Sequence, residues 1–296
     1  MQKGSEGFFM KELVIISGKG GTGKTSLVSA FAALAERKVL CDADVDAADL
    51  HLIMNPEVRQ RHDFAGGHTA VINRDICTEC GLCRELCRWE AISDTFEVDS
   101  ISCEGCGVCY YFCPEKAIDF PEKTCGEWFV SRTRFGPMVH ARLGIAEENS
   151  GKLVTLVRQE AKKLAESDSL DLILTDGPPG VGCPVIASIG GATAVLIVAE
   201  PTVSGKHDLE RVANLANHFR VPSLLCINKY DLNPDESHRI VSLARSMGIG
   251  TVGEIPFDPA FTRAMVEGRC IMEFDGGEQA KESVRRVWKG VLQALA

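Results

Sequence analysis

A glycine-rich stretch at residues 18–25, Gly-Lys-Gly-Gly-Thr-Gly-Lys-Thr, restricts the fold of this chain more than any other segment. It follows an apolar run at residues 13–16, which predicts a buried parallel strand, and it precedes residues 26–35, whose apolar side chains recur at helical spacing. Strand, glycine loop and helix together form a phosphate-binding P-loop. The backbone N–H groups can surround phosphates, Lys24 can reach the outer phosphates, and the Thr25 hydroxyl can bind Mg²⁺.

The loop therefore predicts a nucleotide site. The residues expected to bind the nucleotide here are Gly20, Gly21, Thr22, Gly23, Lys24, Thr25 and Ser26. A purely structural glycine turn is the alternative interpretation. It does not explain why Lys24 and Thr25 occur together at the end of the loop.

Carboxylates stand at the ends of two further apolar runs. Residues 38–41 predict a second strand that ends at Asp42 and Asp44, and residues 170–175 predict another strand that ends at Asp176. The carboxyl ends of strands in an open α/β sheet lie beside the phosphate site, so these side chains are candidates for work on the nucleotide. The alternative is that they only cap and terminate the strands.

Lys19 is a second lysine inside the glycine loop. Residues 19–25 resemble the deviant Walker A motif of the MinD/ParA/Mrp ATPases and the nitrogenase iron protein. In that family this lysine reaches the nucleotide of a partner subunit, so the resemblance implies an ATP-sandwiched homodimer. It also implies that Asp44 orients the attacking water, that Asp42 assists near Mg²⁺ and that Asp176 holds Mg²⁺ through water. The expected catalytic residues are Lys19, Lys24, Asp44 and Asp176. A solvated loop lysine is the alternative for Lys19.

Strand and helix patterns alternate through the second half of the chain. Three more strands are predicted at residues 194–199, 224–228 and 251–255, separated by helices at residues 206–218 and 235–247. Alternation of this kind predicts a doubly wound α/β fold with a parallel sheet and right-handed crossovers.

Residues 228–231, Asn-Lys-Tyr-Asp, match the NKxD motif of GTPases, so guanine must be considered. Relatives of the MinD type also place Asn228 and Lys229 here while using ATP. Their adenine is bound by backbone near a proline like Pro256. ATP is therefore the expected nucleotide, with GTP as the alternative.

Eight of the thirteen cysteines fall in two runs, each with the spacing C-x2-C-x2-C-x3-C. The first run is Cys77, Cys80, Cys83 and Cys87, and the second is Cys103, Cys106, Cys109 and Cys113. This spacing is typical of a bacterial ferredoxin with two [4Fe–4S] clusters, in which the fourth cysteine of each run binds the other cluster. Cluster one is expected to bind Cys77, Cys80, Cys83 and Cys113, and cluster two Cys103, Cys106, Cys109 and Cys87.

The segments after the two runs are similar, since residues 87–92 echo residues 113–118, and this repeat supports the ferredoxin interpretation. Arg88 stands where a proline is usual, which could alter the backbone beside cluster two. Zinc is the alternative, although structural zinc sites favour paired C-x2-C spacings.

The motifs divide the chain into a P-loop domain interrupted by an insertion. We expect a first part at residues 10–65, a small α+β ferredoxin domain at 66–121, and a second part at 122–296 that starts with a connecting β-ribbon, 122–145. This organisation resembles MinD superfamily ATPases with an inserted ferredoxin domain, similar to those encoded beside the orange protein of anaerobes. The resemblance implies a protein redox or metallocluster partner, of the orange-protein or nitrogenase-cofactor kind.

The formal net charge of −9 argues against nonspecific nucleic-acid binding, which needs a basic surface. No apolar run approaches the roughly 20 residues of a membrane helix. Cysteines beside a nucleotide site are expected to be metal ligands before disulfides, which favours a reducing cytoplasm. Residues 1–9 lack the features of a signal peptide, and an upstream start or an added segment would explain them.

The remaining cysteines and the last helix complete the expectations. Cys183 follows the third predicted strand and is interpreted as a small buried thiol; the alternative is a shared cluster, because the nitrogenase iron protein has a cysteine at the comparable place. Core positions are expected for Cys41, Cys226 and Cys270.

Residues 281–296 predict a helix that packs on the sheet, with a membrane-seeking amphipathic helix as the alternative. Its expected buried stripe is Val284, Val287, Trp288, Val291 and Leu292.

The sequence thus predicts an ATPase whose dimer switch is coupled to electron transfer through two [4Fe–4S] clusters. A Mrp-like carrier or assembly ATPase, whose clusters are cargo, is the first alternative. A positioning ATPase of the ParA or MinD kind, with clusters that are only structural, is the second. The sequence identifies neither the electron donor nor the acceptor.

Overall fold

The computed structural model describes residues 10–144 and 150–296, which form two compact units. Of these residues, the sheet unit contains 10–61, 128–142 and 150–296, and the cysteine unit contains 62–127 and 143–144. The predicted insertion, 66–121, therefore lies inside a cysteine unit that is several residues longer at each end.

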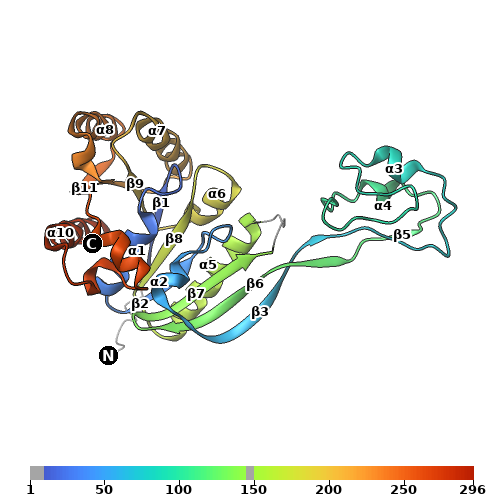
Figure 1. Cartoon of the computed structure of the whole chain (residues 1–296), viewed down its shortest axis with the longest axis horizontal. Coiled ribbons are helices and arrows are strands. Elements are labelled where there is room, and N and C mark those ends of the chain that lie inside the picture. Colours follow the sequence, from blue (N-terminus) through green and yellow to red (C-terminus); the bar gives the residue numbers. More distant parts are fainter. Residues whose placement is uncertain (1–9, 145–149) are drawn as a thin grey trace, which may run out of the picture. The chain divides into compact units, whose positions relative to one another are not determined.

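A nine-stranded sheet has the order β11-β10-β9-β1-β8-β2-β7-β6-β3 (Figure 1). From β11 to β7 every neighbouring pair of strands is parallel, as the alternation of strands and helices predicts. The nine strands are β1 (Lys11–Ser17), β2 (Lys38–Asp42), β3 (Glu57–His68), β6 (Glu122–Thr133), β7 (Gly136–Leu143), β8 (Leu172–Pro179), β9 (Ala194–Ala199), β10 (Ser223–Asn228) and β11 (Gly250–Ile255).

Helices cover both faces of the parallel part of the sheet. Alternation along β1 explains the two layers: Leu13 and Ile15 pack in a core with α1, α2 and α10, while Val14 and Ile16 pack in a second core with α6, α7 and α8. The helices of the sheet unit are α1 (Lys24–Leu34), α2 (Leu50–Met54), α5 (Ser150–Ser167), α6 (Cys183–Ile189), α7 (Val203–His218), α8 (Pro234–Ser246), α9 (Ala260–Val266) and α10 (Glu278–Leu295), with short 3₁₀ turns η1 (Tyr230–Leu232) and η2 (Ile271–Glu273).

The described part of the predicted connecting ribbon, 122–145, forms strands β6 and β7 of the main sheet; residue 145 lies outside the described residues. Its strands β6 and β7 are neighbours joined by only two residues, Arg134 and Phe135, so they form a hairpin. β7 pairs in parallel with β2, with Cys41 opposite Val139. β7 carries several buried side chains, and no sequence motif indicated that this hairpin would join the sheet.

The last helix packs its apolar face on the sheet unit, as predicted. Val287 approaches β11 so closely that a Cβ at Gly253 would lie 2.8 Å from its Cγ2. Trp288 lies 4.8 Å from the ring of Phe31 in α1. One residue of the expected stripe is wrong: Leu292 is 47% exposed, and Leu295 is buried instead. Over the described residues, no helix has the length and apolar character needed to cross a membrane.

The cysteine unit is built from a backbone repeat. Its elements are α3 (Leu82–Leu86), α4 (Val108–Phe112) and the antiparallel pair β4 (Val71–Ile72) and β5 (Ile118–Asp119). Left-handed backbone positions recur with an offset of 26 residues, in the pairs Glu79 and Gly105, Gly81 and Gly107, and Glu90 and Lys116. The two cysteine runs therefore share a conformation as well as a spacing.

Candidate functional site

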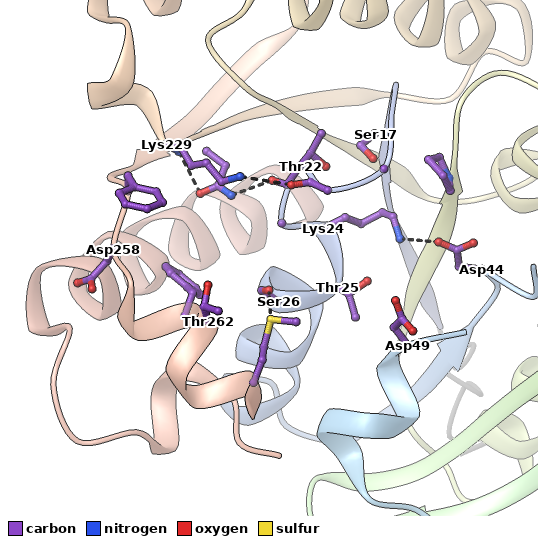
Figure 2. A pocket seen from close by; sticks show the side chains of 18 of the residues that line it. Ser17, Thr22, Lys24, Thr25, Ser26, Asp44, Asp49, Lys229, Asp258 and Thr262 are labelled. Atoms are coloured by element: carbon purple, nitrogen blue, oxygen red, sulfur yellow. Dashed lines mark hydrogen bonds and ion pairs between the residues drawn. The ribbon is translucent and has the colours of Figure 1, made fainter. Parts of the chain in front are cut away.

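A cavity of about 370 Å³ lies at the carboxyl ends of the central strands (Figure 2). Its volume falls in the range of small-ligand pockets. All the predicted nucleotide-binding residues line it: Gly20, Gly21, Thr22, Gly23, Lys24, Thr25, Ser26, Asn228, Lys229 and Pro256. The structure thus brings the loop at residues 20–26 together with two later segments of the chain.

The glycine loop is buttressed by the Asn-Lys pair at the end of β10. Asn228 Nδ2 donates a hydrogen bond to the carbonyl of Thr22, at 2.8 Å, and Lys229 Nζ donates to the carbonyl of Gly21, at 3.3 Å. Gly23 has a φ of +87°, and a Cβ there would lie 2.3 Å from Asn228 Nδ2. Only glycine fits this position, so Asn228 and Lys229 help to shape the loop.

Lys24 lies between two of the predicted carboxylates. Its Nζ is 2.8 Å from Asp176 Oδ1 and 3.2 Å from Asp44 Oδ2, and Figure 2 shows Lys24 and Asp44 pointing toward one another. Burial alone lowers the pKa of Lys24, but the two carboxylates more than offset it, so that pKa is raised. Lys24 is therefore a charged ammonium group inside the cavity wall.

Asp42 is a buried carboxylate that lacks a full set of partners. It lies opposite Asp176 across the β2 and β8 pair, and its Oδ1 accepts a hydrogen bond from the Asp44 N–H. Its Oδ2 has no hydrogen-bond partner among the described residues. Burial, and then the charge of Asp176, raise the pKa of Asp42 well above its usual range.

These carboxylates fit a divalent cation. Asp42, Asp44 and Asp176 face a single buried ammonium group, so one further positive charge would stabilise their ionised forms. Carboxylate and hydroxyl oxygens are the ligands that Mg²⁺ prefers. The predicted Thr25 and Asp42 are thus placed in a region whose chemistry suits Mg²⁺.

Glu200, which follows β9, is a site residue that the sequence analysis missed. Its carboxylate pairs with Lys229, and its Oε2 lies 3.5 Å from Lys19 Nζ. Lys19 also donates to Ser204 Oγ, at 3.4 Å. The lysine predicted to reach a partner's nucleotide is therefore held by its own chain here. No motif marks Glu200, since an acid after a strand is ordinary.

A second missed group forms the wall opposite the glycine loop. It consists of Phe257, Asp258, Phe261, Thr262 and Met265, mostly on α9. Ser26 Oγ lies 3.0 Å from Met265 Sδ, which joins this wall to α1. No local sequence pattern marks these residues as part of the site. Only Pro256, which directly precedes them, predicted the position of the base.

The geometry disfavours the guanine interpretation. Asp231 does not line the cavity; its Oδ1 accepts a hydrogen bond from the Phe257 N–H, at 2.7 Å. The carboxylate that a GTPase motif would use for guanine therefore fixes the backbone of the cavity wall. Asp231 therefore contacts the protein backbone at Phe257 and not the position of a base.

We expect Asp231→Asn to leave nucleotide preference unchanged. Asn retains an oxygen acceptor for the Phe257 N–H but loses the charge that guanine recognition requires. Affinities for ATP and GTP, measured by titration calorimetry, should each change by less than about threefold, which is below 1 kcal/mol. A selective loss of GTP affinity would show that Asp231 contacts the base.

The cysteine unit contains two small cavities, each lined by four cysteines. One is lined by Cys77, Cys80, Cys83 and Cys113, and the other by Cys87, Cys103, Cys106 and Cys109. Each cavity takes three cysteines from one run and the fourth from the other run. These are the two sets that the ferredoxin spacing predicts.

Apolar side chains and backbone amides surround these sulfur atoms. Ile72, Leu82, Phe96 and Ile118 line the first cavity; Trp89, Ile92, Val98 and Phe120 line the second. The crossing sulfurs accept matching backbone hydrogen bonds, Cys87 from Ala91 at 3.4 Å and Cys113 from Ala117 at 3.3 Å. Burial raises the pKa of Cys109 to about 11, so thiolates here need positive partners.

The donor set fits a multi-iron cluster in each cavity. Four thiols, an apolar wall and N–H donors to sulfur are the features that iron–sulfur sites combine. Structural zinc sites favour paired C-x2-C spacings, and here each cavity takes three cysteines from one run and one from the other.

The five cysteines outside the runs have separate environments. Cys41, Cys226 and Cys270 are buried, as predicted, and Cys125 is buried too. The prediction for Cys183 is wrong: it is exposed at the start of α6. As the first residue of a short helix, Cys183 exposes its thiol at the surface, although the residues around it in sequence are small and apolar.

Comparisons with known proteins agree with the fold and the pocket. The model of the family described as "CobQ/CobB/MinD/ParA nucleotide binding domain" matches residues 13–271. An uncharacterized protein of Methanocaldococcus jannaschii is 35% identical over 230 residues, 77% of this chain and 80% of that protein. The structure of the septum site-determining protein MinD complexed with Mg-ADP, from Pyrococcus horikoshii, has a TM-score of 0.59 at 16% identity, over 97% of this chain and 99% of that one.

A shorter match comes from a redox enzyme. Dihydromethanopterin reductase (acceptor) of Methanosarcina mazei is 43% identical over 53 residues. This match covers 16% of the present chain and 22% of that enzyme. It is therefore a similarity of one segment and says nothing about the rest of either protein.

Proposed function

Because the chain belongs to the CobQ/CobB/MinD/ParA family of nucleotide-binding proteins, we propose that it is an ATPase coupled to electron transfer through two [4Fe–4S] clusters. Family membership and the lined cavity support the nucleotide half of this proposal. One observation carries the redox half: each cysteine cavity combines three cysteines of one run with the last cysteine of the other. That crossed arrangement is the ligand pattern of two-cluster ferredoxins.

In the proposed ATPase site, the loop amides bind the phosphates and Lys24 exchanges its carboxylate contacts for phosphate oxygens. Asp42, Asp176 and Thr25 hold Mg²⁺, which when bound neutralises charge on the phosphates. Asp44 orients the attacking water, because its carboxylate already lies at the mouth of the loop beside Lys24. ATP is preferred because Asp231 is bound to the Phe257 amide.

The proposed switch involves a homodimer. Lys19 is 38% exposed and pairs with Glu200, which also pairs with Lys229. If Lys19 moves to a partner's nucleotide, the partly buried Glu200 carboxylate keeps Lys229 as a cationic partner. The exchange is therefore inexpensive for this chain, which suits a reversible dimer.

In the cysteine unit, bound clusters supply one-electron redox chemistry. The chain's own contribution is to line the cavities with apolar side chains and to donate N–H groups to Cys87 and Cys113. The proposed acceptor is a protein redox or metallocluster partner. Charge supports a protein: residues 62–127 contain thirteen Asp and Glu but only five Lys and Arg, so a basic surface would be attracted.

A carrier function is the second candidate, and one observation favours it. Cys80 and Cys106, one ligand in each predicted set, are exposed. Exposed ligands ease the release of a cluster, as cargo would require. Chelator treatment during ATP turnover separates the two functions, since a redox relay retains its iron and a carrier loses it.

We expect MgATP, but not MgADP, to shift the reduction potential of a cluster. A coupling of 5- to 150-fold is ordinary for linked sites and corresponds to ~40–130 mV for a one-electron couple. Potentiometry of the anaerobically purified protein under each nucleotide measures this shift, and acceptor reduction rates provide a second readout.

The matched variant for this experiment is Lys19→Ala. It should abolish the shift while iron content stays at the wild-type value, because Lys19 lies in the glycine loop, outside both cysteine cavities. Identical potentials under both nucleotides in the wild type would contradict coupling and leave an ATPase with passive clusters.

A further inference from the structure

We propose that Arg134 is a positioning residue that joins the end of α2 and the segment after α9 to strand β6 and so transmits the nucleotide state to the cysteine unit. The inference rests on the proposed function, because it explains how ATP could affect the clusters. Arg134 occupies the two-residue turn between β6 and β7.

The Arg134 guanidinium is saturated with hydrogen bonds. Its Nε and Nη2 form a bidentate pair with Glu273, at 2.6 and 2.7 Å. Its Nη1 donates to the carbonyls of Ile53 and Met54, at 2.8 and 3.1 Å, and Nη2 also donates to the carbonyl of Gly268, at 3.2 Å. A planar, bidentate arginine of this kind fixes orientation as well as distance.

These partners lie beyond two segments whose other residues line the cavity. Ile53 and Met54 end α2, whose preceding residues include Asp49 of the cavity lining. Gly268 follows α9, whose Thr262 and other side chains form the missed wall. One guanidinium therefore contacts both the end of α2, which follows Asp44 and Asp49, and the segment that follows α9.

The Glu273 carboxylate stays ionised in its contact with Arg134. It also accepts a hydrogen bond from the Cys270 N–H, at 3.0 Å, which fixes the η2 turn. Arg134 and this N–H lower the pKa of Glu273 to about 2. The pair is therefore intact at every pH at which the protein would be assayed, and proton binding does not disturb it.

Strand β6 is the route from this joint to the cysteine unit. It begins at Glu122 inside that unit and ends at Thr133, next to Arg134. It lies between β7 and β3 in the sheet order, so it has hydrogen-bonded neighbours on both sides. β6 thus runs without interruption from the cysteine unit to the residue before Arg134, and a change at Arg134 can reach that unit along this strand.

The test compares Arg134→Lys with Arg132→Lys in the anaerobic holoprotein. Arg132 is an exposed arginine two residues earlier on the same strand, so it controls for charge and position. Lysine at 134 keeps the charge but loses the bidentate fork and several of the carbonyl contacts. We expect the coupling between nucleotide and cluster to fall at least about fivefold in Arg134→Lys, which is a loss of ~40 mV from the nucleotide-dependent potential shift, and to be unchanged in Arg132→Lys.

Two further readouts separate transmission from folding. Iron content should equal the wild-type value, because Arg134 lines neither cysteine cavity. Hydrogen exchange of the β6 amides, residues 122–133, should respond to MgATP in the wild type and lose that response in Arg134→Lys. Should Arg134→Lys fail to fold, Glu273→Gln tests the same joint from its other side and should give the same two losses.

The outcomes distinguish this inference from the function on which it rests. A wild-type shift that persists at full size in Arg134→Lys or Glu273→Gln would overturn the positioning function alone. A wild type without any nucleotide-dependent shift would contradict the proposed coupling and, with it, the inference. Loss of the shift in Arg134→Lys and its retention in Arg132→Lys would support both.

Discussion

Replacing Cys113 with serine is expected to remove about half of the iron, from about eight atoms per chain to about four. Cys113 lines the cavity that holds Cys77, Cys80 and Cys83, although it belongs to the other run. Its loss should therefore empty the cavity of the first run and spare that of its own run. Iron analysis and electron paramagnetic resonance of the reduced protein, which should lose its two-spin coupling, provide the measurement.

Cys183→Ser is the matched control for this prediction. Cys183 is exposed and lines neither cysteine cavity, so iron content and the coupled spectrum should stay as in the wild type. Ala117, whose N–H bonds to Cys113 Sγ, offers a milder perturbation. Ala117→Pro removes that donor and should shift one potential without loss of iron. Zinc in place of iron after anaerobic purification would end the cluster interpretation.

Lys24→Ala is expected to abolish tight ATP binding, whereas Asp44→Ala should preserve binding and block hydrolysis. Lys24 is the buried cation at the loop, and its removal also leaves Asp176 and Asp42 without a positive partner. In the proposed mechanism Asp44 acts only when water attacks, so its loss should lower kcat by about 100-fold or more with little change in Kd. Calorimetry and phosphate release measure the two effects.

Asp49→Ala serves as the control for charge. Asp49 lines the same cavity, yet it makes no hydrogen bond to Lys24 and is not assigned to the machinery. Its removal should change kcat by much less than Asp44→Ala does. Equal losses of affinity in Lys24→Ala and Asp44→Ala would show that Asp44 contributes to binding and would contradict its proposed function as the water-orienting group.

Local spacing accounts for the features that the sequence predicted well. The glycine loop and the cysteine runs are each set by residues near one another in the chain, and the parallel strands are marked by continuous apolar runs such as residues 194–199. The placement of Cys87 and Cys113 each with the cysteines of the other run was also predictable, because both runs have the ferredoxin spacing. Such patterns need no tertiary information.

The features that were missed depend on contacts between distant residues. Glu200 meets Lys19 and the α9 wall meets Ser26 only after the sheet has formed, because these partners are more than 180 residues apart. The prediction for Cys183 was wrong for a related reason. Apolar neighbours in the sequence do not determine whether the first residue of a helix faces the core or the surface. Tertiary packing overrides local composition at such positions.

The path of the chain into the cysteine unit has an evolutionary consequence. It leaves along β3 and returns along β6, and these strands are neighbours at one edge of the sheet. An ancestral protein could therefore acquire residues 62–127 of this unit by lengthening the connection between these two strands, without reordering any other strand or crossing any connection. Insertion at such an edge leaves the glycine loop, its carboxylates and both cores in their original register, so a cysteine-rich unit could be gained in one genetic event while the older site continued to work.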